Sequence, residues 1–337
     1  MGRGQLLRSS RVRFGVVAAA LLAVAALGSG GQWQVVAGMA AVLAVVYAFR
    51  HTLFRLVLWA IGRAQGVPLS VALRHAAQDR AMECEVERLR QASRMVEKDP
   101  AGYEKWETPL GAYWIPSRKI AGDALLEMLA EESMEIYGHG PAGVNAGDVV
   151  LDCGANVGTF VREALAAGAS RVIASEPTAE NLECLRRNCP EALADGRLVL
   201  VPKGVWHEET TIQLFVSDSP AGDSFVVSAK KAEGPVLEVT TIDRIAETLG
   251  LERLDFIKFD IEGAERNALR GAAKTLRSLR PTLAVSAYHL KDDPDVLSGI
   301  IGEAGAGYQK TAIGARLIVP GLLSSYMLPI VLLFRRA

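Results

Sequence analysis

The chain is poor in cysteine and carries almost no net charge, and both shortages exclude whole classes of protein. Only 4 of its 337 residues are cysteine, and Cys84, Cys153, Cys184 and Cys189 form no Cys-x-x-Cys pair or Cys/His cluster. That spacing fits neither a zinc site nor a disulfide-stabilised scaffold. The formal net charge is −1, so no basic face is expected, and nucleic acid is not predicted as a partner.

Charged side chains are also absent from residues 14–49, which contain two apolar runs, 14–27 and 33–49, on either side of a glycine-rich turn. A crossing helix needs at least ~17 apolar residues. Each run is short but workable if it borrows neighbours from the glycine-rich turn, so the runs predict a transmembrane helical hairpin within an anchor at residues 1–65. Arginines flank both runs, which places both flanks in the cytoplasm. The flanking arginines are Arg3, Arg8, Arg11, Arg13, Arg50, Arg55 and Arg63. A cleaved signal peptide ending near residues 26–28 is the alternative that the same features allow.

The chain after the anchor is predicted to consist of a connecting part at residues 66–134 and a catalytic domain at residues 135–337. A charged helix is expected over residues 70–98, because few large apolar residues interrupt its acids and bases. A short strand at residues 113–116 and a helix at residues 123–133 are expected to follow.

Two further apolar stretches bear on the membrane. Residues 56–61 contain Trp59 and are flanked by arginine, and we expect them to lie in the membrane interface. Residues 317–334 are uncharged and long enough to cross a bilayer. Proline, glycine and serine interrupt them, however, and favour a final pair of antiparallel strands with residues 330–334 buried.

The most informative motif is the segment Asp152-Cys-Gly-Ala-Asn-Val-Gly158, which lies between two apolar runs. This order predicts a buried parallel strand, a tight loop and the start of a helix. Gly154 and Gly158 would let the backbone approach a ligand closely. The middle glycine of the dinucleotide fingerprint Gly-x-Gly-x-x-Gly is missing. Because Asp152 would repel a phosphate, the loop suits a ligand that carries a cation.

Two more predicted strands are followed by acids. Glu176 follows the run 172–174, and a carboxylate at the end of the second strand of a doubly wound sheet can accept both hydroxyls of a ribose. An adenosyl ligand and NAD would use such an acid equally well. The run 254–259 is followed by Asp260, Glu262 and Glu265, and the carboxyl ends of strands are where open α/β sheets bind ligands.

Together these residues resemble FkbM-type methyltransferases, which use S-adenosylmethionine. The similarity runs through residues 135–138, 147–158, 176–182, 240–243, 258–265 and 280–289. It implies a Rossmann-like class I methyltransferase domain, an α/β fold with a seven-stranded, mostly parallel sheet.

The resemblance also implies a role for each candidate residue. The methionine part of S-adenosylmethionine would contact Asp152 and a loop formed by Gly154, Ala155, Asn156 and Gly158. The ribose would bind Glu176, the adenine would lie beside Gly204 and Val205, and Asp260 would face the donor or the acceptor. Candidates for the group that takes a proton from the acceptor are His289, Glu262 and Asp260, and the sequence leaves the choice among them open. The acids have no convincing metal-ligand spacing, so no metal site is predicted.

The acceptor is expected to be a hydroxyl. No Asn-Pro-Pro-Tyr or Asp-Pro-Pro-Tyr segment follows any strand, and methyltransferases that act on exocyclic base or glutamine nitrogens usually carry one. The anchor adds the expectation of a membrane protein with a cytosolic catalytic domain, acting on a small-molecule or lipid-linked acceptor. Two other classes stay open, a nicotinamide-dependent dehydrogenase and a non-catalytic membrane scaffold that retains a nucleoside-binding fold.

Overall fold

The structure is a computed structural model that describes Met39, Phe49 and residues 52–118, 121–138, 140–216, 232–305, 307–320 and 324–336. The predicted transmembrane hairpin at residues 14–49 lies outside the described residues, apart from Met39 and Phe49, which are helical. Among the residues described, no helix is both long and apolar enough to span a membrane. The chain divides into two compact units, one of residues 1–81 and 317–327, the other of residues 82–316 and 328–337.

The first unit contains a helix at residues 52–60 and two short strands, β13 (Arg316–Ile318) and β14 (Tyr326–Leu328), that pair with each other. The helix α3 (Leu69–Ala92) contributes residues to both units. In the helix at 52–60, Arg55 and Leu58 are buried, whereas Leu53, Val57 and Trp59 are exposed.

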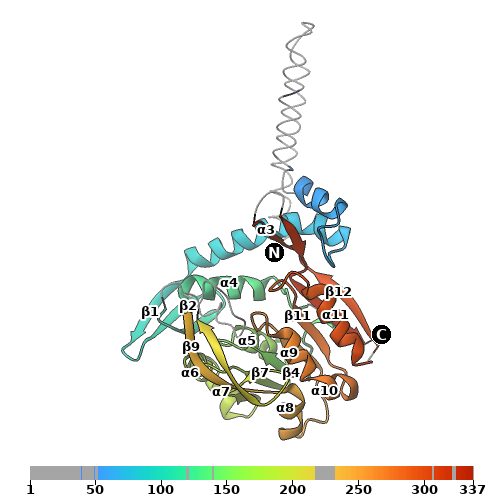
Figure 1. Cartoon of the computed structure of the whole chain (residues 1–337). Coiled ribbons are helices and arrows are strands. Elements are labelled where there is room, and N and C mark those ends of the chain that lie inside the picture. The colour runs from blue at the N-terminus through green and yellow to red at the C-terminus, as the bar shows by residue number, and fades with distance from the viewer. Residues whose placement is uncertain are drawn as a thin grey trace. The chain divides into compact units, whose positions relative to one another are not determined.

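The second unit is built on a seven-stranded sheet in the order β12-β15-β11-β10-β4-β5-β6 (Figure 1). Its strands are β4 (Val149–Cys153), β5 (Arg171–Ser175), β6 (Leu198–Val201), β10 (Phe256–Phe259), β11 (Thr282–Ser286), β12 (Tyr308–Ile313) and β15 (Val331–Arg336). Each neighbouring pair from β6 to β11 is parallel, and β15 is antiparallel to both β11 and β12. The predicted mostly parallel seven-stranded sheet is confirmed. The expected antiparallel strand near the carboxyl end is β15, with residues 331–334 buried, but its partners β11 and β12 both precede residue 317.

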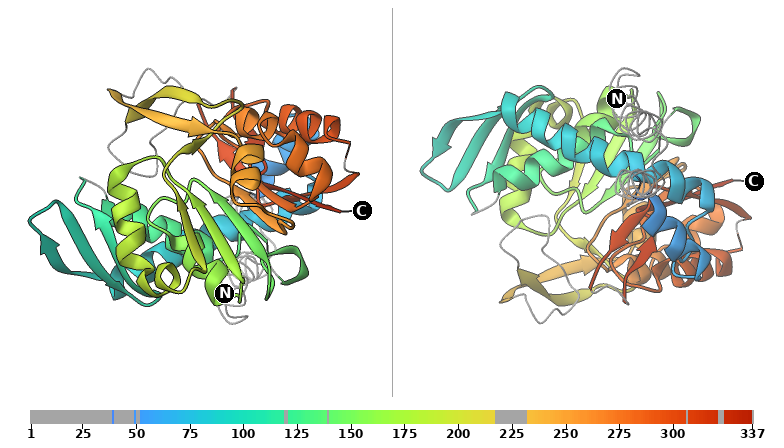
Figure 2. Two further views of the ribbon diagram at one scale, coloured as in Figure 1. Left: turned by 90° about the horizontal axis from the view of Figure 1, so that it is seen from below. Right: turned by 90° about the horizontal axis from the view of Figure 1, so that it is seen from above.

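Helices cover both sides of this sheet (Figure 2). They are α5 (Thr159–Ala166), α6 (Ala179–Asn188), α7 (Pro190–Ala194), α8 (Ile242–Thr248), α9 (Glu265–Arg270), α10 (Ala273–Ser278) and α11 (Asp293–Glu303). Alternate strand residues belong to opposite faces: Leu151 and Ile257 join one buried cluster, whereas Val150 and Phe256 join the other. Because both faces are covered, the parallel strands are mostly apolar, with Asp152 in β4 and Lys258 in β10 as charged exceptions, which is why they are visible in the sequence.

A smaller antiparallel sheet precedes this domain. Its strands are β1 (Arg94–Asp99), β2 (Tyr103–Thr108) and β3 (Gly111–Pro116), and α4 (Ala121–Ser133) follows them. The predicted strand at 113–116 and helix at 123–133 are therefore confirmed. The predicted helix over 70–98 is wrong at its end, since α3 stops at Ala92 and β1 begins at Arg94. All but the last residue of β1 are exposed, so no apolar alternation marks the strand, and pairing with β2 outweighs local helix propensity.

A third sheet combines β7 (Gly204–Val205), β8 (Thr210–Val216) and β9 (Ala232–Thr240) in the order β7-β9-β8. Gly204 and Val205 pair in parallel with Val239 and Thr240 of β9. This pairing fixes the backbone immediately after the loop that leaves β6.

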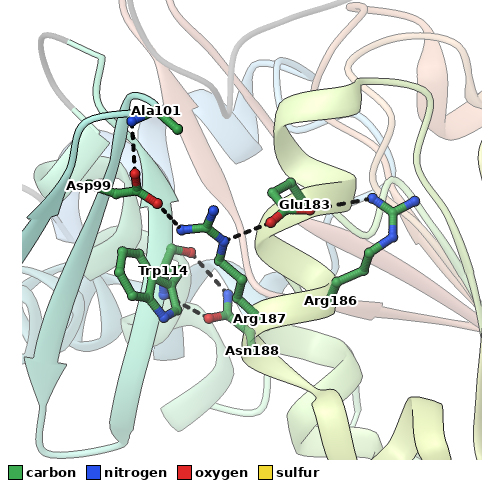
Figure 3. A network of polar contacts seen from close by, with 7 residues as sticks. All are labelled: Asp99, Ala101, Trp114, Glu183, Arg186, Arg187 and Asn188. Carbon is green, nitrogen blue, oxygen red and sulfur yellow. Dashed lines mark hydrogen bonds and ion pairs between the residues drawn. The ribbon is translucent and has the colours of Figure 1, made fainter.

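Arg187 of α6 holds the small β1–β3 sheet against the main domain (Figure 3). Its guanidinium donates hydrogen bonds to Asp99 Oδ2 at 2.6 Å and to Glu183 Oε1 at 2.8 Å. The same group lies 4.5 Å from the ring centre of Tyr103 and 4.8 Å from that of Trp114. The planar guanidinium therefore makes hydrogen bonds to two carboxylates and cation–π contacts with two aromatic rings. A lysine ammonium would not reproduce this set of contacts.

We expect Arg187→Met to lower the free energy of unfolding by about 1–2 kcal/mol, because the buried stem is kept while the charged hydrogen bonds and ring contacts are lost. The adjacent Arg186 is the matched control, since it is half exposed and contacts Glu183 at 3.7 Å (Figure 3). Arg186→Met should change the stability by less than about 0.5 kcal/mol. Urea unfolding of the two variants tests this, and equal losses would contradict it.

Candidate active site

The sheet reverses its strand order at β4, which pairs with β5 on one side and with β10 on the other. Ligands of open α/β sheets bind outside the carboxyl ends of the strands at such a reversal. Here two loops meet, residues 154–158 after β4 and residues 260–264 after β10. Gly154 has a φ of +82°, and a Cβ at this position would overlap the backbone carbonyl oxygen of Asp260. The glycine is therefore required for the contact between the two loops.

The glycine loop also makes a direct hydrogen bond to Glu176, the residue predicted to bind the ribose hydroxyls. The amide of Asn156, a residue with a φ of +49°, donates a hydrogen bond to Glu176 Oε2 at 3.0 Å. The amides of Gly154 and Ala155 both donate to the carbonyl oxygen of Ser175 at the end of β5. Three of the four loop residues predicted to bind S-adenosylmethionine are thus hydrogen-bonded to residues at the end of β5. The fourth, Gly158, precedes α5 and has a φ of +90°.

Glu176 is buried and keeps a fixed orientation. Its Oε1 accepts hydrogen bonds from the Thr178 amide at 2.9 Å and from the Thr178 hydroxyl at 2.6 Å. Burial raises the pKa of Glu176 above its ordinary value, against the hydrogen bonds from Thr178, Asn156 and Asn181, which lower it. A carboxylate held on three sides in this way presents its remaining acceptor positions in one direction.

The adenine candidates lie next along the same edge. The Ser175 hydroxyl donates to the carbonyl oxygen of Lys203 at 2.6 Å, and the Glu176 amide donates to the carbonyl oxygen of Val201 at 3.2 Å. These bonds join the end of β5 to the loop that leads into Gly204 and Val205, both of which are buried. The backbone around these two residues is therefore positioned beside Glu176.

Asp152 pairs with a cation of the chain itself. Its Oδ1 lies 3.1 Å from Lys258 Nζ, and both side chains are almost completely buried. The two residues stand opposite each other in the register of β4 and β10. Burial raises the pKa of Asp152. Burial would also lower the pKa of Lys258, but Asp152, Asp260 and Glu132 together hold it above its ordinary value.

Lys258 and Tyr137 are the neighbours that sequence reasoning missed. The Lys258 ammonium lies 5.0 Å from the ring centre of Tyr137 and 5.5 Å from that of Phe160, within the range of a cation–π contact. The Tyr137 hydroxyl donates a hydrogen bond to Asp260 Oδ2 at 2.8 Å. A lysine inside an otherwise apolar strand was a usable signal for a buried partner. Tyr137 lies in residues 135–138, where the family resemblance begins, but sequence reasoning assigned it no role.

All three predicted catalytic residues come together at the carboxyl ends of β10 and β11. His289 Nε2 lies 3.8 Å from Asp260 Oδ1 and 3.8 Å from Glu262 Oε2. His289 Nδ1 lies 3.1 Å from Glu265 Oε1, and Glu265 also accepts the Ile261 amide at 3.0 Å. Glu262 has a φ of +55°, so this turn is strained for a residue with a side chain.

The acids around His289 set its charge. Burial lowers its pKa, but Glu265, Asp260 and Glu262 more than offset this and raise the pKa to about 9. At neutral pH the imidazole of the ligand-free chain therefore carries a proton. Burial raises the pKa of Asp260, but the positive charges of Lys258 and His289 more than offset this, and the net pKa lies below its ordinary value. On α4, burial and the nearby Asp260 raise the pKa of Glu131 to about 8.

Comparison with known proteins identifies this region. Residues 152–309 match the family model described as the Methyltransferase FkbM domain. A search of curated proteins gave no match.

Several solved methyltransferases show remote similarity. A methyltransferase FkbM from Methylobacillus flagellatus KT is 19% identical, with 76% of this chain and 58% of that chain covered and a TM-score of 0.41. An rRNA methylase from Streptococcus thermophilus is 14% identical over 61% of this chain and 94% of that chain, with a TM-score of 0.36. A precorrin-6y C5,15-methyltransferase from Geobacter metallireducens GS-15 is 14% identical over 57% of this chain and 80% of that chain, with a TM-score of 0.33. The chain thus spans less than two thirds of the first of these proteins.

The family match begins at Asp152, runs through the glycine loop, Glu176 and the cluster around His289, and ends at Gln309 in β12. It therefore contains every residue of the site built above except Glu131, Glu132 and Tyr137. Residues 152–309 thus match the methyltransferase FkbM domain, and a match to this family implies S-adenosylmethionine as the methyl donor.

Proposed function

We propose that this methyltransferase transfers its methyl group to a hydroxyl of a lipid-linked or other amphipathic acceptor at a membrane. The observation that carries the donor half of the proposal is the hydrogen bond from the glycine loop to the buried carboxylate of Glu176. The bond joins the loop 154–158 to the end of β5. S-adenosylmethionine, a nucleoside that carries an amino acid, needs these two elements side by side.

The residues at the carboxyl end of β4, where the strand order reverses, suit S-adenosylmethionine. Buried polar atoms without a hydrogen-bond partner among the described residues include Asp152 Oδ2, Asn156 Oδ1 and Asp260 Oδ1. All three are acceptors, and buried acceptors of this kind normally have a donor. An ammonium group and ribose hydroxyls are such donors. We assign the ribose to Glu176, the methionine part to the loop 154–158 with Asp152 and Asp260, and the adenine to Gly204 and Val205.

The acceptor side is assigned to the cluster of Asp260, Glu262 and His289. S-adenosylmethionine, when bound, supplies a methyl group on a good sulfonium leaving group. A hydroxyl is a weak nucleophile until its proton is removed. As the new oxygen–carbon bond forms, the carbon–sulfur electron pair goes to sulfur and the hydroxyl proton goes to a basic group. The carboxylates of Asp260 and Glu262 are such groups at the same sheet edge as the donor loop, whereas His289 is already protonated at neutral pH. Positioning and proton removal are the proposed contributions of the cluster.

The membrane part of the proposal is supported by the helix at residues 52–60. Leu53, Val57 and Ile61 are exposed apolar side chains spaced four residues apart, and the Ile61 amide continues the helical hydrogen bonding to the Val57 carbonyl. They therefore form one apolar stripe, whereas the exposed Trp59 lies on a different side of the same helix. The uncharged residues 14–49 precede this stripe in the chain. We propose that the stripe lies in the membrane interface and that the catalytic domain faces the cytosol.

Incubation of membranes that contain the full chain with S-adenosylmethionine labelled in its methyl group tests the acceptor. We expect label in a fraction extractable by organic solvent, at a rate at least about ten-fold above that of Glu176→Gln, which loses charged hydrogen bonds to the donor. The label should survive alkaline hydrolysis, because methyl ethers withstand base whereas methyl esters release methanol. Label confined to water-soluble products would argue against a lipid-linked acceptor. Release of the label as methanol would argue against a hydroxyl.

A further inference from the structure

The imidazole of His289 is arranged as metal-ligating histidines are. Its side chain is 9% exposed, and Nδ1 lies 3.1 Å from the Glu265 carboxylate, which is fully buried. Both ring nitrogens are buried and neither makes a hydrogen bond among the described residues, so the contact of Nδ1 with Glu265 is an ion pair and Nε2 is available to a ligand. A histidine that binds a metal through one nitrogen usually has the other oriented by a carboxylate or carbonyl. Glu265 provides that orientation and points Nε2 toward Asp260 and Glu262.

The distances around Nε2 suit a small cation. Asp260 Oδ1 and Glu262 Oε2 each lie 3.8 Å from Nε2, which is too long for a hydrogen bond. One ligand atom from each of the three residues lies within 4.8 Å of the others. Ligands about 2.1 Å from one ion are roughly 3.0 Å apart at right angles and roughly 4.2 Å apart when opposed. A small side-chain adjustment therefore brings all three atoms onto one ion.

The position of each ligand is fixed from outside the cluster. The Tyr137 hydroxyl donates to Asp260 Oδ2 at 2.8 Å and leaves Oδ1 facing His289. Glu262 holds its left-handed backbone conformation between Asp260 and the start of α9. Three carboxylates surround one imidazole here, so the cluster has an excess of negative charge even when His289 is protonated. Such an excess favours an added cation.

We propose that Asp260, Glu262 and His289 bind a divalent cation of the Mn²⁺ type, with Glu265 orienting His289. Carboxylates suit Mg²⁺ and Mn²⁺, imidazole suits the transition metals, and the mixed set favours Mn²⁺ over Mg²⁺. Three protein ligands leave the other positions of an octahedral ion for water or substrate oxygen. Bound there, the cation would hold the acceptor oxygen and lower its pKa. This last role rests on the proposed methyl transfer to a hydroxyl, whereas the binding site itself does not.

Titration of the metal-free full chain with Mn²⁺, followed by the electron paramagnetic resonance signal of free Mn²⁺, tests the site. We expect one ion per chain. His289→Gln should abolish binding, and Glu265→Gln should weaken it by roughly 10–100-fold, the usual cost of losing an outer carboxylate. His207 is the matched control, because it also lies near a carboxylate, Glu208 at 3.5 Å, but is well exposed. His207→Gln should bind Mn²⁺ like the wild type.

Failure to bind Mn²⁺ by the folded wild-type chain, or unchanged binding by His289→Gln, would overturn the site. Nitrogen hyperfine coupling from an imidazole in the pulsed spectrum of the wild type gives a second test that needs no variant, and its absence would also overturn the proposal. Calorimetric binding of S-adenosylhomocysteine, measured on the same samples, distinguishes failure of the metal site from failure of the donor site. An intact donor affinity without Mn²⁺ binding would refute the metal site alone.

Discussion

Replacement of Asp152 by alanine is expected to lower the free energy of unfolding by about 3–5 kcal/mol, because it leaves the charge of Lys258 buried without its partner. Lys258 Nζ lies 3.1 Å from Asp152 Oδ1 in the centre of the sheet, and both side chains are at most 6% exposed. Lys258→Met should lower the free energy of unfolding by a similar amount, because it leaves the Asp152 carboxylate buried without its hydrogen-bond partner. Urea unfolding at neutral pH measures both losses.

The double variant Asp152→Leu/Lys258→Met is the informative control. An apolar pair of similar volume avoids the desolvation of both charges, so its stability should return to within about 1–2 kcal/mol of the wild type. A double variant as unstable as either single one would contradict this account of the pair. If the double variant is stable but binds S-adenosylhomocysteine weakly, the Asp152–Lys258 pair acts on the donor in addition to its structural role. Unchanged binding would leave Asp152 with the structural role alone.

Gly154→Ala is expected to remove measurable donor binding and to destabilise the protein by about 2–5 kcal/mol. A left-handed conformation costs a residue with a side chain about 1–2 kcal/mol, and overpacking adds about 1–3 kcal/mol. The overpacking arises because the new Cβ would overlap the carbonyl oxygen of Asp260. Relief of that overlap must move the two loops apart, and with them the groups assigned to the donor.

A comparison with Gly196 separates the cost of the left-handed backbone from the cost of the overlap with Asp260. It has a φ of +79°, close to the +82° of Gly154, but a Cβ there would meet no atom within 4 Å. Gly196→Ala should therefore lose only about 1–2 kcal/mol and keep its affinity for S-adenosylhomocysteine. Unfolding curves and calorimetry on both variants make the comparison. Equal affinities in the two variants would show that contact between the loops is not required for the donor site.

The sequence predicted the elements of the site better than their connections. Buried parallel strands are mostly apolar, so the acids that end them at Asp152, Glu176 and Asp260 stand out. Since the carboxyl ends of such strands share one edge, the meeting of His289 with Asp260 also followed from the pattern. The pairing of Asp152 with Lys258 did not follow, because it depends on the register of two strands that are about a hundred residues apart.

Local geometry explains the other differences between prediction and structure. Glu262 and Glu265 are three residues apart but do not lie on one helix, because α9 begins at Glu265 and Glu262 precedes it in a left-handed turn. That turn lets both acids approach His289. The strand β1 was predicted as helix because its exposed residues carry no apolar alternation. Tyr137 precedes the family match and reaches Asp260 only through the tertiary fold.

Calorimetric titration of the full chain with S-adenosylhomocysteine tests the central claim most directly. We predict one site per chain in the wild type and a loss of roughly ten-fold or more in Glu176→Gln, since hydrogen bonds to a charged group are worth about 1.5–3 kcal/mol. Glu180 is the matched control, because it is half exposed and pairs with Arg118 on the surface. Glu180→Gln should bind like the wild type. Absence of binding by the folded wild type, or unchanged affinity in Glu176→Gln, would contradict the donor site proposed at this edge of the sheet.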